Sequence, residues 1–366
     1  MPNGFTAGVD PTGAVAAAEE SAVFGTSERS VFSMSKLNDM LLTLFLCLVV
    51  VPFTADGAGA KTYLGVSGIS FDYIPFWYAK DYHLYEKYNV DVDMITTGGG
   101  TVLAQAMLSG GVQFGALGTA FLQSAMQGAD HVLLAAHINY FPYRVVGLPS
   151  IAGKDGLKGA TIAISRFGSN ADAALRIALR QAGLDPAKDV TIVQLGTQPE
   201  RLAALNGRRV QATIMSPPFS SAAKKAGLKV ILDISRMRVA FPEIGLVASR
   251  DYVAKNRASA KGLMQAYLEA IRDIKKNKES TVRVLAKYLR MDLESNRDIL
   301  VDAYDETVAS DELEKKPYPN RDGVKLAVEL IAKQRNISPI PPVDNFIDTG
   351  LLEELDRSGF IDRLYR

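Results

Sequence analysis

The chain has 366 residues, and its 41 basic and 40 acidic side chains give a formal net charge of +1 at pH 7. A balance this close gives no electrostatic basis for binding nucleic acid. The single cysteine, Cys47, excludes an internal disulfide and a cysteine-based metal site. The length beyond residue 60 is sufficient for one large domain or for two lobes.

The first 60 residues divide into two segments that we expect to lie outside the folded domain. Residues 1–33 are rich in Ala, Gly, Ser and Thr without an apolar period, which predicts a disordered leader or a gene start placed too early. Residues 34–60 combine Lys36, an apolar run interrupted by Pro52 and a small-residue ending at Ala60, a pattern typical of a cleavable signal peptide. The run is shorter than the roughly 20 residues that span a bilayer, which disfavours the alternative of a retained anchor. Removal of both segments leaves a net charge of about +5.

From residue 61 onward, short apolar strands alternate with helices. The expected strands cover residues 61–67, 90–95, 112–117 and 131–137. The expected helices cover residues 75–88, 101–109 (with Thr101 as its cap) and 119–127. Strands that alternate with helices of about ten residues indicate a parallel sheet with helical crossovers.

The same order of elements restarts after residue 157. Strands are expected at residues 160–165, 190–195, 210–215 and 229–233, with a helix at 171–182. A further helix should begin at Thr197, which has capping-box spacing to Glu200, and end at Asn206-Gly207. From residue 252 the chain is mainly helical and charged, with a proline-rich loop at 337–342 and a terminal helix.

A weak internal repeat relates the two halves at a constant offset of 98 residues. Residues 104–118 align with residues 202–216, and Val112-Gln113 matches Val210-Gln211. Each copy is a helix, a glycine-containing turn, a strand and a small residue. Chance similarity between two helix–turn–strand units is one explanation. We favour two lobes of similar topology, each an open sheet that binds ligand at the carboxyl ends of its strands.

An ordered set of features then resembles a known family. After the signal-like segment come a strand, an aromatic helix and strand (PFWYAKDYHLYEKYNVDVDMI, 75–95), a triple glycine and the stretch AMLSGGVQFGALGTA (106–120). This order resembles the periplasmic solute-binding proteins of ABC importers. The most similar subgroup serves the uptake of sulfonates, taurine, nitrate and thiamine-precursor pyrimidines. The resemblance covers residues 61–366 and identifies no ligand.

The resemblance implies an α/β fold of two lobes (type 2-like), each an open, mainly parallel sheet flanked by helices. A two-strand hinge would join the lobes and let them close over one small molecule. Residues 61–143 and 244–366 would form lobe 1, with the C-terminal helices, and residues 144–243 would form lobe 2. The expected crossover strands are 144–148 and 244–249. The resemblance also implies a periplasmic monomer that has no cofactor, binds no nucleic acid and serves an ABC permease in the inner membrane.

Ligands in open α/β sheets bind beyond the carboxyl ends of the strands, where loops lead into helices. In the first half, Tyr73 offers a stacking wall, and the free N–H groups at glycines 98–100 suit an anion or a carbonyl, unless this loop is only a flexible turn. Gly118 permits close backbone approach, whereas Thr119 is equally a plain N-cap. The candidates are Phe71, Tyr73, Gly99, Gly100, Thr101, Gly118, Thr119 and His137.

In the second half, the loop between the strand at 160–165 and the helix at 171–182 is the main candidate. Ser169 is placed to cap that helix, to bind a sulfonate, carboxylate or ring nitrogen, or to do both. Two prolines stiffen the loop after the strand at 210–215 and remove two donors, which leaves Ser216 and Phe219 as contacts. The candidates are Phe167, Gly168, Ser169, Asn170, Ser216, Phe219 and Phe241.

Two other functions, an enzyme and a ligand-sensing module, are less consistent with the sequence. Residues 61–366 contain no G-x-S-x-G elbow, P-loop, G-x-G-x-x-G or H-E-x-x-H motif. The enzyme of this fold that makes the thiamine pyrimidine carries a cysteine-rich motif, and no cysteine follows residue 60. His83, His131 and His137 show no metal-ligand spacing, so we predict no metal and no catalytic site. A ligand-sensing module would need a membrane tether, and nothing after residue 61 is apolar enough for one.

Overall fold

The computed structural model describes residues 61–309 and 313–366. The expected leader (1–33) and signal peptide (34–60) lie outside these described residues. Within the described ranges, the helices are all too short or too polar to cross a bilayer.

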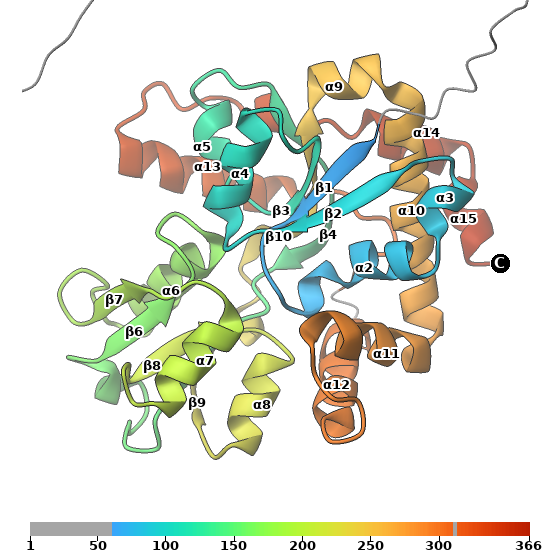
Figure 1. Cartoon of the computed structure of the whole chain (residues 1–366). Helices are drawn as coiled ribbons and strands as arrows, with labels where there is room; N and C mark the ends of the chain where they lie inside the picture. Colours follow the sequence, from blue (N-terminus) through green and yellow to red (C-terminus); the bar gives the residue numbers. More distant parts are fainter. Residues whose placement is uncertain (1–60, 310–312) are drawn as a thin grey trace, which may run out of the picture. The chain divides into compact units, whose positions relative to one another are not determined.

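Two five-stranded sheets form the frame of the fold (Figure 1). The first sheet has the order β2-β1-β3-β10-β4, built from β1 (Thr62–Val66), β2 (Val92–Thr96), β3 (Phe114–Leu117), β4 (His131–Tyr140) and β10 (Ala240–Ser249). The second has the order β7-β6-β8-β5-β9, built from β5 (Arg144–Gly147), β6 (Thr161–Ile164), β7 (Thr191–Gln194), β8 (Ala212–Met215) and β9 (Lys229–Asp233). We call each sheet with its helices a lobe.

Each sheet has four strands in one direction and a single opposed strand. In the first lobe β10 pairs antiparallel with both β3 and β4, and in the second lobe β5 pairs antiparallel with both β8 and β9. The other pairs, β1 with β2 and β3 and β6 with β7 and β8, are parallel. The prediction of an α/β fold with two open, mainly parallel sheets is confirmed. The opposed strands are the ones that follow the passages of the chain between the sheets, at residues 141–143 and 234–239.

Helices cover both sheets. Those of the first lobe are α2 (Ile74–Asp81), α3 (Leu84–Lys87), α4 (Gly100–Leu108), α5 (Leu122–Ala125), α9 (Arg250–Lys255), α10 (Arg257–Lys276), α11 (Lys278–Leu289), α12 (Arg297–Tyr304), α13 (Arg321–Arg335), α14 (Gly350–Arg357) and α15 (Phe360–Leu364). Those of the second lobe are α6 (Asn170–Gln181), α7 (Gln198–Asn206) and α8 (Phe219–Lys225). The longest, α10, buries Tyr267 and Ile271 on one face, where Tyr267 stacks on Phe76 of α2 at 5.2 Å between ring centroids. This amphipathic face is the reason that a helix with many charged residues forms part of the core.

Three helix predictions need correction. The single helix expected at 75–88 is broken into α2 and α3, because His83 adopts a left-handed conformation with φ +53° that ends the first helix. The helix expected at 119–127 is reduced to the single turn α5. Thr101 does not cap its helix: α4 begins at Gly100, and its N-cap is Gly99, whose φ of +141° suits glycine.

The internal repeat is visible in the structure at the same offset. The pair α4–β3 and the pair α7–β8 are displaced by 98 residues at both ends of the helix and at both ends of the strand. The two glutamines at matched positions of the repeat also make equivalent hydrogen bonds to the backbone. Gln113 accepts a hydrogen bond from the Tyr63 backbone N–H at 2.9 Å, and Gln211 accepts one from that of Thr161 at 2.8 Å. The two lobes therefore share their local topology and the side-chain contact that joins the two parallel strands.

Candidate functional site

A polar cavity of about 70 Å³ lies between the lobes. Its walls are the loops that follow the carboxyl ends of β1, β2 and β3 in the first lobe and of β6 and β7 in the second. Tyr143, in the first passage of the chain between the sheets, and Glu243, near the start of β10, also line it. This is the position at which open α/β sheets bind ligands.

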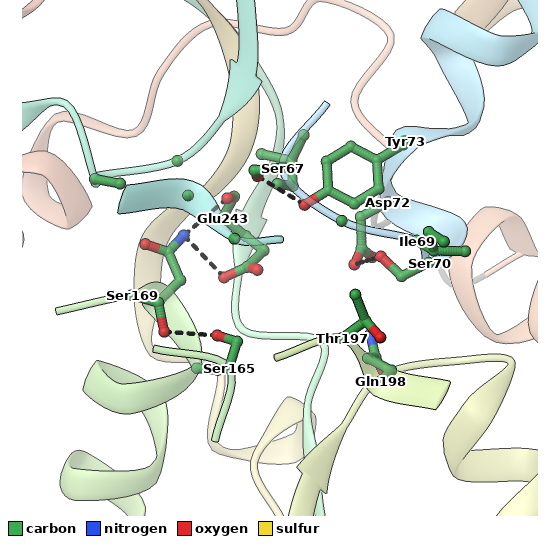
Figure 2. Close-up of a pocket in the computed structure, with 18 of the residues that line it drawn as sticks. Ser67, Ile69, Ser70, Asp72, Tyr73, Ser165, Ser169, Thr197, Gln198 and Glu243 are labelled. Carbon is green, nitrogen blue, oxygen red and sulfur yellow. Dashed lines mark hydrogen bonds between the residues drawn. The ribbon is translucent and has the colours of Figure 1, made fainter. Parts of the chain in front are cut away.

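The cavity is lined by matched residues from the two halves of the repeat. Each matched pair is separated by 98 residues: Ser67 and Ser165, Gly98–Gly100 and Gly196–Gln198, and Asp72 and Asn170. Figure 2 shows Ser67 and Asp72 on one side of the cavity and Ser165 and Ser169 on the other. The repeated topology thus brings equivalent loops of the two lobes to face each other.

Asp72 is the first of two buried acids in the lining. Its side chain leaves the 3₁₀ turn η1 (Phe71–Tyr73) and is only 4% exposed. Its Oδ2 accepts hydrogen bonds from the Ser70 hydroxyl at 2.7 Å and from the Ser216 hydroxyl at 3.3 Å. Burial raises the pKa of Asp72 to about 6, although both hydroxyls favour the ionised form.

Glu243, on β10, is the second acid and is 2% exposed. The Tyr143 hydroxyl donates to its Oε1, and Asn170 Nδ2 donates to its Oε2 at 3.1 Å. Burial raises the pKa of Glu243 to about 8, and the negative charge of Asp72 acts in the same direction. At neutral pH this carboxyl is therefore mainly protonated, although it faces a polar cavity.

Arg201 is the buried cation of the lining. It projects from α7, is 2% exposed, and donates through Nη1 to the Gly196 carbonyl and through Nη2 to the Ile214 carbonyl at 3.0 Å. Burial lowers its pKa to about 10, so it stays charged at neutral pH. Its Nε has no hydrogen-bond partner among the described residues. A buried donor without a partner is costly, which indicates a place for an added acceptor.

Three helix N-termini, of α4, α6 and α7, adjoin the cavity but differ in their capping. At α6 the N-cap Ser169 accepts a hydrogen bond from the Asp172 backbone N–H through its side chain. The N-cap of α4 is Gly99, which has no side chain to satisfy the first N–H groups. At α7 the Glu200 carboxylate accepts from the backbone N–H of Thr197 at 2.6 Å and from its hydroxyl at 2.8 Å, which confirms the predicted capping box. The α4 terminus is therefore the one left open to an anion or a carbonyl oxygen.

The structure brings six of the fifteen predicted site residues into the lining: Tyr73, Gly99, Gly100, Gly118, Ser169 and Asn170. The other nine lie outside it: Phe71, Thr101, Thr119, His137, Phe167, Gly168, Ser216, Phe219 and Phe241. Several of these support the lining. The Thr119 hydroxyl donates to Asn170 at 2.6 Å, and Ser216 contacts Asp72 as described above.

Two further predicted residues outside the lining, His137 and Phe241, pack against other side chains. His137 is fully buried, where its ring bonds to the Tyr267 hydroxyl and the Asp72 carbonyl, and burial lowers its pKa to about 4. Phe241 stacks on Phe141 at 4.4 Å between centroids. It lines a second cavity of about 540 Å³ between α6 and α13, together with Gly168 and Thr119.

Sequence reasoning missed the charged members of the lining. Asp72 lies between two predicted site residues, Phe71 and Tyr73, and Glu243 lies two positions after a third, Phe241. Arg201 was interpreted only as part of a helix. The repeat held the missing signal, because its offset pairs Asp72 with the predicted Asn170 and Ser67 with Ser165.

The buried acid Glu243 predicts an unusual dependence of stability on pH. Between pH 6.5 and 8 the folded protein keeps a proton on Glu243, with its pKa near 8, whereas the unfolded chain, with a pKa of 4.5, has released it. Unfolding then releases a proton, so stability should fall as pH rises, by roughly 2 kcal/mol across this window. Below pH 6.5 the raised pKa of Asp72 and the lowered pKa of His137 have opposite effects and partly cancel.

Urea denaturation at pH 6.5, 7.25 and 8 measures this slope in the unliganded protein. The Glu243→Gln variant should show a flatter profile, because its amide does not titrate. Stability that is constant or rises with pH in the parent protein would show that Glu243 is ionised in the folded state.

Two α/β lobes with a ligand-sized polar cavity between them define the periplasmic binding protein fold. The chain belongs to the NMT1-like family, whose model matches residues 60–290. A protein of Brucella abortus named as a binding protein is 24% identical over 219 residues, which are 58% of this chain and 67% of that protein.

Two solved structures share the fold. The ligand-binding component of an ABC-type import system from Staphylococcus aureus has a TM-score of 0.64 and 15% identity, over 81% of this chain and 99% of that one. The periplasmic aliphatic sulphonate binding protein SsuA from Escherichia coli has a TM-score of 0.59 and 21% identity, over 81% of this chain and 99% of that one. The resemblance predicted from the sequence is thereby confirmed at the level of family and fold.

Proposed function

We propose that the chain is the solute-binding component of an ABC importer. It would be exported to the periplasm through its signal peptide, act there as a monomer, and deliver a small organic ligand to a permease in the inner membrane. The ligand range is a sulfonate, a carboxylate or a pyrimidine-like molecule. The observation that carries this proposal is a polar cavity whose walls come from matched loops of both lobes.

The mechanism is binding followed by a shift between open and closed populations. A ligand that touches loops of both lobes stabilises the arrangement in which the lobes are close, and the permease recognises that form. We propose that the passages at 141–143 and 234–239 act as the hinge, with residues 144–233, from β5 to β9, as the moving lobe. The cavity volume of about 70 Å³ is several times the roughly 10–15 Å³ that one water molecule needs, which suits a compact ligand.

No specific observation favours catalysis. Among the described residues, the lining of this cavity includes neither histidine nor cysteine, the usual general base and the strongest nucleophile. The buried acids Asp72 and Glu243 have neighbours that hold them in place through hydrogen bonds. Binding is the activity that these groups support best.

A thermal-shift screen of the protein with sulfonates, carboxylates, nitrate, amino acids and pyrimidines tests the proposal. A ligand at 100 times its Kd should stabilise the protein by about 2.7 kcal/mol and raise Tm by a few degrees. Small-angle X-ray scattering should then show a smaller radius of gyration with ligand. Turnover of a bound compound, or stabilisation without any contraction, would contradict the importer mechanism.

A matched pair of glycine variants separates binding from folding. Gly98 lines the cavity, and a Cβ there would meet no atom within 4 Å, so Gly98→Leu should fold normally and lower the affinity at least tenfold. Gly111→Leu is the control, because Gly111 lies outside the cavity lining and its nearest contact would be an ordinary 3.7 Å. Equal affinity in the two variants would place the ligand elsewhere.

A further inference from the structure

We infer that the ligand is bipolar: a positively charged nitrogen group is bound by Asp72 and Glu243, and an oxygen acceptor is bound by the donors that line the same cavity, the uncapped α4 N-terminus and the Arg201 guanidinium. This inference rests on the proposed function, because it assigns the ligand class of the same cavity. The proposed ligand range includes simple anions. This inference narrows that range to ligands that carry both a positively charged nitrogen and an oxygen acceptor.

The acidic end of the cavity has unused hydrogen-bond acceptors. Asp72 receives both of its side-chain hydrogen bonds on Oδ2, and no donor of the described chain contacts Oδ1. Each Glu243 oxygen receives one side-chain bond, whereas a carboxylate oxygen can accept two. An N–H group placed here would supply the missing donors. An anion would instead face the negative charge of the buried Asp72, which is unfavourable at low dielectric.

The loop Gly98–Gly100 and the N-terminus of α4 prefer a hydrogen-bond acceptor instead of a donor. The first N–H groups of α4 have no side-chain cap, and Gly98–Gly100 line the cavity. Independently, the Nε of the buried Arg201, which lines the same cavity, has no hydrogen-bond partner in the described part of the chain. Both features call for an acceptor such as a carboxylate, sulfonate or carbonyl oxygen. A ligand with one kind of group would satisfy either the acceptors or the donors of the lining, but not both.

Binding of a cationic group should be coupled to release of a proton. The groups that face Glu243 come from several elements: Asp72 and Tyr73 from η1, Tyr143 from the loop before β5, and Asn170 from α6. With its pKa raised to about 8, the Glu243 carboxyl keeps its proton at pH 7 in the unliganded protein. A positively charged nitrogen favours the ionised form, so affinity should rise with pH between 6 and 8, at most tenfold per pH unit.

Isothermal titration calorimetry with matched compounds tests the assignment. Taurine and isethionate share a sulfonate and differ in an ammonium or a hydroxyl; β-alanine and 3-hydroxypropionate form the equivalent carboxylate pair. We expect the nitrogen compound of a pair to bind at least tenfold more tightly. Titration in buffers of different ionisation enthalpy should show proton release near pH 7, in the unmodified protein and without reliance on any variant.

Variants then assign the proton and the charge. Glu243→Gln should remove the proton release and lower affinity for the nitrogen compound at least tenfold, whereas Glu329→Gln, an exposed change on α13, should alter neither. Equal or tighter binding of the hydroxyl compounds would overturn the bipolar assignment and leave the importer function standing. Failure of all four compounds and of the wider screen, with no contraction in scattering, would overturn the importer function as well.

Discussion

Replacing Asn170 with aspartate should destabilise the protein by about 3–5 kcal/mol, because it puts an uncompensated charge into a buried network. Asn170 Nδ2 donates to the Glu243 carbonyl at 2.8 Å, to the Pro242 carbonyl at 3.1 Å and to the Glu243 side chain at 3.1 Å. A carboxylate has no donor for these three acceptors. The change has nearly the same shape, so the loss would report electrostatics and hydrogen bonding rather than a cavity.

The same side chain joins the two lobes. Asn170 begins α6 of the second lobe, whereas its partners Thr119 and Glu243 belong to loops and strands of the first. Loss of this contact should therefore shift the protein toward the open form and weaken ligand binding, in addition to lowering stability. The effect should diminish as pH falls, because protonation of the introduced carboxyl restores a donor.

Urea denaturation at pH 5 and pH 8 measures both parts of this prediction. Asn277→Asp is the matched control, since Asn277 is exposed between α10 and α11, where the favourable effect of an acid on the start of α11 is opposed by its effect on the end of α10. A loss of less than 1 kcal/mol in Asn170→Asp at pH 8, or a loss that is the same at both pH values, would show that the network does not hold the lobes.

Much of the fold could be predicted because local sequence patterns, such as apolar runs, glycine turns and helical periodicity, indicate its strands and helices. From residue 61 to residue 233, the predicted strands and the helices α4, α6 and α7 lie close to their observed bounds, whereas the helices predicted at 75–88 and 119–127 do not, and α8 is not predicted. The errors come from single-residue backbone conformations. The left-handed His83 inside an otherwise continuous helical pattern carries no mark that distinguishes it from a helical residue. Tertiary contacts determine such positions.

The candidate site was predicted less completely, for a reason that concerns charge. The loops at strand ends are recognisable from topology, and six lining residues came from them. Charged residues are usually solvent-exposed, so Asp72, Arg201 and Glu243 gave no sign of burial in the sequence. Asp72 and Glu243 have hydrogen-bond partners far away in the chain, Ser216 and Tyr143, which no local sequence pattern indicates. A stricter use of the repeat would have found Asp72 as the partner of Asn170.

Replacing Gly118 with alanine should be about as damaging as the change at Asn170, through sterics alone. A Cβ at Gly118 would lie 2.1 Å from Asn170 Nδ2, 2.3 Å from the Glu243 carbonyl oxygen and 2.4 Å from that of Pro242. Both carbonyls accept hydrogen bonds from Asn170 Nδ2, so the added methyl group would clash with the bonded groups of this network themselves. Overpacking typically costs about 1–3 kcal/mol and occasionally more, and three contacts below 2.5 Å place this change at the upper end of that range. It would also displace the acid that we assign to the ligand.

Thermal and urea denaturation measure the loss, and Gly98→Ala is the control, because a Cβ there meets nothing within 4 Å. The double variant Gly118→Ala with Asn170→Ala removes one of the three clashing atoms but leaves both carbonyls. We therefore expect the double variant to remain less stable than Asn170→Ala alone. Equal stability of these two proteins would mean that β10 yields to the added methyl group, and that the amide of Asn170 is the only barrier to it.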